Sequence, residues 1–110
     1  MATQISAMPE CLPEMVTRIV QRFDPLRIIL FGSWARGEAK PDSDVDLLVV
    51  LPHVENKRKA TIRIGNTLSD LRVSKDIIVT TPDDIARREN MVGTILYPAL
   101  REGKVIYERS

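Results

Sequence analysis

The sequence predicts an α/β protein, because three short apolar segments alternate with longer amphipathic ones. Arg27–Phe31, Asp44–Leu51 and Val73–Thr80 are rich in Ile, Val and Leu and bounded by Gly, Pro or Asp, as buried strands are. Pro9–Phe23 and His53–Arg72 instead carry apolar residues at helical spacing. Strands that alternate with helices predict a small mixed central sheet of three to four strands flanked by helices.

Length and composition limit the function classes. A chain of 110 residues that is 44% hydrophobic predicts one domain with one core over residues 1–110, of which 1–8 are expected to fray. The 16 Lys and Arg residues nearly balance 15 Asp and Glu, so nucleic acid is not expected as a direct stable partner. Cys11 cannot form an internal disulfide, and neither a signal peptide nor an apolar run of ~20 residues is present. A cytoplasmic protein without membrane contact is expected, and homo-oligomerisation stays open.

The first two strands are joined by a break and a short helical segment. Asp24-Pro25 ends the first helix, since proline cannot continue it. Gly32 permits close backbone approach, and Ser33 is predicted to be a first-turn or cap residue for a helical segment over Trp34–Glu38. The start of a helix exposes backbone N–H groups, which makes it an anion site.

The second half of the chain is expected to continue the alternation. Gly65 weakens the long predicted helix, because glycine costs ~1 kcal/mol relative to alanine there. Thr81 is predicted to cap a helix that runs from Pro82 to about Asn90. A last helix over Met91–Glu102 and an edge strand over Lys104–Glu108 follow.

Three aspartates stand where strands begin. Asp44 and Asp46 are two residues apart, so within a strand both would point to the same face. Two such like charges repel each other unless a cation lies between them. Carboxylate oxygens are ligands that suit Mg²⁺. Asp76 would join them only if the third strand neighbours the second. Beside a Gly-Ser break that can hold a triphosphate, these acids predict in-line displacement at phosphorus, which needs no nucleophilic side chain.

Two peptide segments carry a resemblance. Phe31-Gly32-Ser33-Trp34-Ala35-Arg36-Gly37 and Ser43-Asp44-Val45-Asp46-Leu47, with ten residues between Ser33 and Asp44, resemble the nucleotidyltransferase superfamily that includes DNA polymerase β, and most of all its minimal branch, the MNT proteins. The resemblance implies the nucleotidyltransferase fold, with Gly32 and Ser33 on the triphosphate and Asp44 and Asp46 on Mg²⁺. Asp76 matches the third acid of the family, although its spacing is looser.

The resemblance also implies a function. MNT proteins pair with HEPN-domain ribonuclease toxins as antitoxins, and some transfer AMP from ATP to a toxin tyrosine. The expected cofactors are two Mg²⁺ ions, and the expected substrate is ATP. Arg36 either contacts the triphosphate or the partner, or caps the local helix. Two alternatives remain: an antitoxin that acts by binding alone, and a nucleotidyltransferase that modifies a small molecule or an RNA end. The short chain disfavours the latter acceptors, since little remains to build a second substrate wall.

Overall fold

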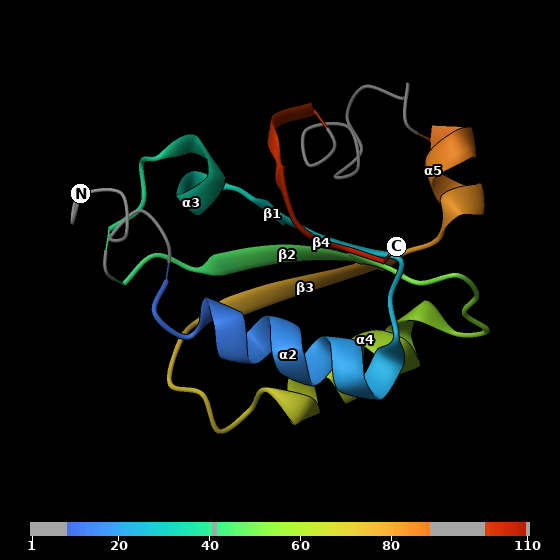
Figure 1. The fold of residues 1–110 in the computed structure, drawn as a ribbon, viewed down its shortest axis with the longest axis horizontal. Helices are drawn as coiled ribbons and strands as arrows, with labels where there is room; N and C mark the ends of the chain where they lie inside the picture. Colours follow the sequence, from blue (N-terminus) through green and yellow to red (C-terminus); the bar gives the residue numbers. More distant parts are fainter. Residues whose placement is uncertain (1–8, 41, 89–100, 110) are drawn as a thin grey trace.

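Four strands form one mixed sheet in the computed structural model, which describes residues 9–40, 42–88 and 101–109 (Figure 1). The strand order is β3-β2-β1-β4. β2 (Val45–Val50) pairs parallel with β3 (Lys75–Thr80) and antiparallel with β1 (Arg27–Phe31), which in turn pairs antiparallel with β4 (Lys104–Glu108). The predicted α/β class, the size of the sheet and the C-terminal edge strand are confirmed. No helix in the described ranges is long and apolar enough to cross a membrane.

Helices α2 (Leu12–Phe23) and α4 (Lys57–Thr67) lie together against one face of the sheet (Figure 1). Alternate strand residues point to this face, as the two-residue period of a strand requires. The core contains fully buried side chains from both layers: Met15, Ile19, Ile28, Leu30, Val45, Leu47, Val49, Ile64 and Leu68. Burial of each large aliphatic side chain contributes roughly 1.5–3 kcal/mol, so this layer supplies most of the hydrophobic stabilisation.

The other face of the sheet carries a smaller apolar cluster. Ile29, Phe31 and Leu48 are buried there, and Ile78 packs against them. Asp46 and Asp76 belong to the same alternate positions of β2 and β3 as Leu48 and Ile78. The two carboxylates therefore lie on the sheet face that α2 and α4 leave uncovered.

The longest of the predicted helices is shorter at both ends in the structure. The helix expected over His53–Arg72 is only α4, because the Asn56 side chain caps it by accepting a hydrogen bond from the Lys59 N–H at 3.0 Å. At its C-terminal end the Leu68 N–H bonds to the Gly65 carbonyl at 3.1 Å, and this tighter turn ends the helix.

Smaller boundary errors occur elsewhere. α2 begins at Leu12 rather than Pro9, and β2 and β3 begin at Val45 and Lys75, one and two residues later than predicted. The cap predicted for α5 (Pro82–Arg88) is confirmed, since the Thr81 hydroxyl accepts from the Asp84 N–H at 3.2 Å. The frayed segment 1–8 and most of the predicted last helix lie outside the described residues.

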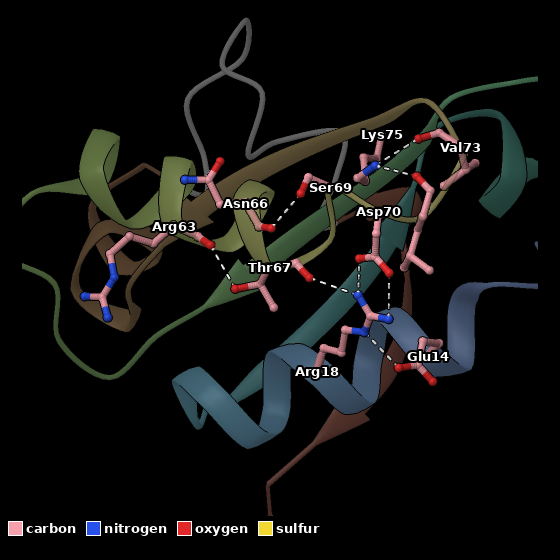
Figure 2. Close-up of polar contacts among 10 residues, drawn as sticks. Glu14, Arg18, Arg63, Asn66, Thr67, Ser69, Asp70, Val73 and Lys75 are labelled. Atoms are coloured by element: carbon pink, nitrogen blue, oxygen red, sulfur yellow. Dashed lines mark hydrogen bonds and ion pairs between the residues drawn. The ribbon is translucent and has the colours of Figure 1, made fainter.

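One guanidinium joins α2 to the turn that follows α4 (Figure 2). Arg18 donates from Nη2 to Asp70 Oδ2 at 3.1 Å and from Nη1 to the Thr67 carbonyl at 3.1 Å. Its Nε also donates to Glu14 Oε2 at 2.8 Å, within α2 itself. Because Nη1 also donates to Asp70 Oδ1, the contact between Arg18 and Asp70 is bidentate. This geometry holds a guanidinium in one orientation.

We predict that Asp70→Asn lowers the unfolding temperature at pH 7 and that this loss disappears in acid. Hydrogen bonding from Arg18 lowers the pKa of Asp70. The stabilisation is therefore fully present above the unfolded pKa of about 4, and it is lost as the pH falls through the lower folded value. Calorimetry between pH 7 and pH 2 measures this, with Glu14→Gln as the control that removes only a local pair. An equal loss at every pH would contradict the prediction.

Candidate functional site

The bend after β1 has a conformation that requires glycine. Gly32 has φ 75° and ψ −155°, a region that essentially only glycine occupies. The side chain of Asp46 lies against it. A Cβ added at Gly32 would overlap Asp46 Oδ2 and stand 3.0 Å from its Cγ. Glycine is therefore needed both for the backbone turn and for the space that the carboxylate fills.

A short helix, α3 (Ser33–Arg36), begins immediately after this bend. Gly32 takes the cap position, and its carbonyl accepts from the N–H groups of Ala35 and Arg36 at 3.1 Å each. Ser33 is the first helical residue, because the positive φ of Gly32 starts the turn one position earlier. Of the two roles predicted for Ser33, the first-turn position is therefore confirmed and the cap position is wrong, and the helix ends at Arg36 rather than at Glu38. The N–H groups of Ser33 and Trp34 have no acceptor within the helix and remain at the bend.

Two of the three predicted acids stand side by side. Asp46 and Asp76 are Cα partners in the parallel pair of β2 and β3, so both side chains leave the same face of adjacent strands. Strands in a sheet lie about 4.8 Å apart, which sets the scale of their separation. Asp44 lies one residue before β2 and is exposed. The condition set by the sequence, that the third strand must neighbour the second, is met.

The pKa of Asp46 depends on the charges of the other two acids. Partial burial raises the pKa of Asp46 above its ordinary value, and the negative charges of Asp76 and Asp44 raise it further. The charge of Arg36 acts in the opposite direction. The site thus holds excess negative charge that its own cation does not neutralise.

Arg36, the cation whose charge acts on Asp46, forms ion pairs with two glutamates. Its Nε donates to Glu38 Oε1 at 2.9 Å, and its Nη1 lies 3.9 Å from Glu102 Oε1. The bond to Glu38 raises the pKa of Arg36. Both partners were missed by sequence reasoning. Glu102 is far away in the sequence, and a glutamate two residues after an arginine carries no recognisable signal.

The loop before Asp44 is fixed by a buried tryptophan. Trp34 is packed in the main core, and its Nε1 donates to the Ser43 carbonyl at 3.2 Å. Ser43 in turn accepts at its hydroxyl from the Lys40 N–H at 2.8 Å. α3 therefore positions the residue that immediately precedes Asp44, a role that its aromatic character alone did not reveal.

The donor set fits a Mg²⁺ ion that arrives with a triphosphate. Within the described ranges, no three His, Cys, Asp or Glu side chains are grouped closely enough to hold a metal by themselves. Mg²⁺, however, is commonly bound by one or two carboxylates together with substrate phosphates and water. Asp46 and Asp76 provide such a pair, and a cation there would relieve the repulsion that raises the pKa of Asp46.

We predict that Gly32→Ala is considerably more disruptive than Gly37→Ala. Both glycines have φ 75°, but a Cβ at Gly37 meets nothing within 4 Å, whereas one at Gly32 overlaps the Asp46 carboxylate. Left-handed strain alone costs about 1–2 kcal/mol, and the Gly32 variant adds displacement of Asp46. Denaturant unfolding of both variants measures the difference. Equal losses would show that the carboxylate is not confined by this glycine.

We also predict that Asp46→Asn raises the unfolding temperature at neutral pH in the absence of divalent cations. Because the folded pKa of Asp46 is raised, its ionisation costs stability above that pKa and costs nothing below the unfolded value of about 4. The advantage of the variant should therefore shrink as the pH falls. Scanning calorimetry in EDTA tests this, with the exposed Asp42→Asn as control. A variant less stable than the parent at pH 7 would contradict it.

The amino-acid sequence is similar to those of known proteins. The sequence profile described as "Nucleotidyltransferase domain" matches residues 12–99. A protein of Methanocaldococcus jannaschii, named as a candidate protein adenylyltransferase, is 32% identical over 108 residues, and the match covers 89% of this chain and 70% of that protein.

Two solved structures share the fold. A candidate nucleotidyltransferase from Sulfolobus solfataricus has a TM-score of 0.67 at 22% identity, covering 96% of this chain and 86% of its own. A toxin–antitoxin structure with AMP-PNP has a TM-score of 0.62 at 17% identity, covering 90% and 75%. The profile match spans most of the chain and includes the Gly32 bend and all three acids. The chain therefore belongs to the nucleotidyltransferase domain family, as its two motifs predict, and is a transferase of that family.

Proposed function

We propose that this protein transfers AMP from ATP, with Mg²⁺, to a hydroxyl group of a partner protein. The observation that carries the proposal is the in-register pair Asp46 and Asp76 beside the Gly32 bend, which brings two carboxylates next to the start of α3. The name of the Methanocaldococcus jannaschii relative supports adenylyl transfer to a protein as the reaction.

Each predicted site residue has a role in this reaction. The triphosphate is held by the backbone at Gly32, by the Ser33 N–H and hydroxyl, and by Arg36 at the rim. Asp44, Asp46 and Asp76 hold Mg²⁺, with two ions as the expected number. When bound, the metal neutralises charge on the phosphate oxygens and lowers the pKa of the acceptor hydroxyl.

The transfer step conserves atoms and charge. The acceptor oxygen attacks the α-phosphorus and forms a new P–O bond, while the bond from that phosphorus to the α,β-bridging oxygen breaks. Pyrophosphate leaves with the bonding electrons, and the acceptor proton passes to a carboxylate oxygen of Asp76. Asp76 suits this role because it is exposed, whereas Asp46 is partly covered by the Gly32 bend. Position and charge supply the catalysis, as is usual in phosphoryl chemistry.

The acceptor that we propose is a tyrosine of a HEPN-domain ribonuclease toxin, which the transfer inactivates. The shared fold with a toxin–antitoxin structure supports this context. Asp44 and Asp76 are both exposed, so the acidic site is open to the side chain of another protein. In this function the chain is an antitoxin that acts by covalent modification.

We predict that Asp46→Asn and Asp76→Asn each reduce AMP transfer by about 100-fold or more, because each removes charge that binds the metal against the triphosphate. The assay incubates the purified protein with α-³²P-labelled ATP, Mg²⁺ and the product of its genomic neighbour, and follows label on the neighbour. Asp42→Asn is the matched control, because it makes the same change at an exposed acid of the loop that leads into β2. EDTA should abolish the transfer.

Two results would reject catalysis. One is the lack of label on the partner. The other is equal labelling by the parent and by Asp44→Ala/Asp46→Ala. If that double variant still protects cells from the partner, neutralisation occurs by binding alone. Label on an RNA end or a small molecule instead of the protein would keep the chemistry and replace the acceptor.

A further inference from the structure

A hollow lies between the C-terminal end of α2 and the N-terminal half of α4. It has a volume of about 530 Å³. Its apolar lining comes from three segments of the chain, namely the end of α2, the stretch after β2, and α4: Phe23, Leu51, Pro52, Val54 and Ala60. A neighbouring hollow shares Arg22, Phe23 and Arg63 and extends along α4 to Asn66 and Thr67. We call the two together the α2–α4 groove.

Three cations border this groove. Arg22, Lys59 and Arg63 line it, and Glu55 is the one acid among its lining residues. Within the described part of the chain, none of the three cations forms an ion pair with a carboxylate, in contrast to Arg18 and Arg36. Arg63 points away from the Arg18 network (Figure 2) and lies over the Phe23 ring, 5.8 Å from its centroid.

An exposed apolar residue extends the same helix face. Ile62 is 52% exposed, which is unusual for a large aliphatic side chain in this protein. It lies three residues after Lys59 and four before Asn66, so all three share one side of α4. The surface therefore combines an apolar centre with a basic border, the composition typical of protein interfaces.

The α2–α4 groove is distant from the acidic site. Asp46 lies at the start of β2, where it pairs with Phe31, while Leu51 follows the far end of the same strand. Five residues of extended chain span about 17 Å. Figure 1 shows α3 at one end of the sheet and the end of α2 with the start of α4 at the other. A ligand in the groove does not compete with a nucleotide at the acids.

From this arrangement we infer that the α2–α4 groove docks an acidic amphipathic segment of a partner protein. Charge complementarity selects the occupant: its carboxylates pair with Arg22, Lys59 and Arg63, and its apolar residues cover Phe23 and Ile62. Such a segment meets the groove as an amphipathic helix or strand meets a hydrophobic groove. The docking needs no nucleotide, so its test is independent of the transfer reaction.

RNA is disfavoured as the occupant. Base stacking needs an accessible aromatic face, and Arg63 already covers one face of Phe23, which is the one Phe, Tyr or Trp residue among the lining residues. The formal charge of the chain is only +1, so it lacks the broad positive field that attracts a phosphate backbone. Carboxylates with apolar neighbours match the lining better than phosphates with bases do.

We predict that a fluorescein-labelled peptide of about twelve residues, with leucines among glutamates, binds the full chain and shifts amide NMR signals around Phe23 and Val54–Arg63 but not around Gly32–Asp46. Arg22→Glu/Lys59→Glu should weaken binding about 10-fold or more, and raising NaCl from about 50 to 500 mM should weaken it as well. Arg58→Glu/Arg72→Glu is the matched control: it makes the same charge change at exposed cations outside the groove, and it should lose at most about 2-fold.

Several outcomes would overturn the inference: no binding of the acidic peptide, equal loss in the two double variants, NMR shifts centred on the acidic site, or tighter groove-dependent binding of a uridine RNA of the same length. A peptide with glutamine in place of glutamate separates charge from apolar contact, and undiminished binding of it would also contradict the proposal. NMR spectra of each variant establish that it is folded before its affinity is compared.

Discussion

The close contact between Asp46 and the Gly32 backbone is the constraint on which the site depends. β1 and β2 pair so that Phe31 stands opposite Asp46, and the chain must then turn without a side chain at the next position. The positive φ of Gly32 achieves this and starts α3 at Ser33. One glycine therefore places a carboxylate, a helix start and a backbone bend within a few ångströms of each other.

The two faces of the sheet divide stability from chemistry. The face under α2 and α4 is filled with fully buried aliphatic residues. Arg18 links α2 to the end of α4 and the turn that follows it. The opposite face carries a smaller cluster and the aspartates. Repulsion and burial raise the pKa of Asp46, a cost to the folded state that the larger core can offset. Functional sites commonly contain such destabilising charge.

Nearly balanced composition conceals a local separation of charge. The chain carries 16 basic and 15 acidic residues. The acids Asp44, Asp46 and Asp76 lie toward one end of β2 and β3, while Arg22, Lys59 and Arg63 border the groove at the other end. The nearly balanced bulk charge is the reason that a general nucleic-acid binder is not expected, and it carries no information about either local surface. Two chemically different surfaces become available on one small sheet.

The sequence alone determined the α/β class, the Gly-Ser bend and the candidate acids, because these depend on local period and on residue chemistry. It also identified the family through two peptide segments that lie close together in the chain. Only the tertiary structure decided that β3 lies beside β2 in the register that brings Asp76 next to Asp46, that Glu38 and Glu102 hold Arg36, and that α2 and α4 enclose a basic groove. Each of these requires pairing between distant segments, and a local pattern does not encode which strands and helices become neighbours.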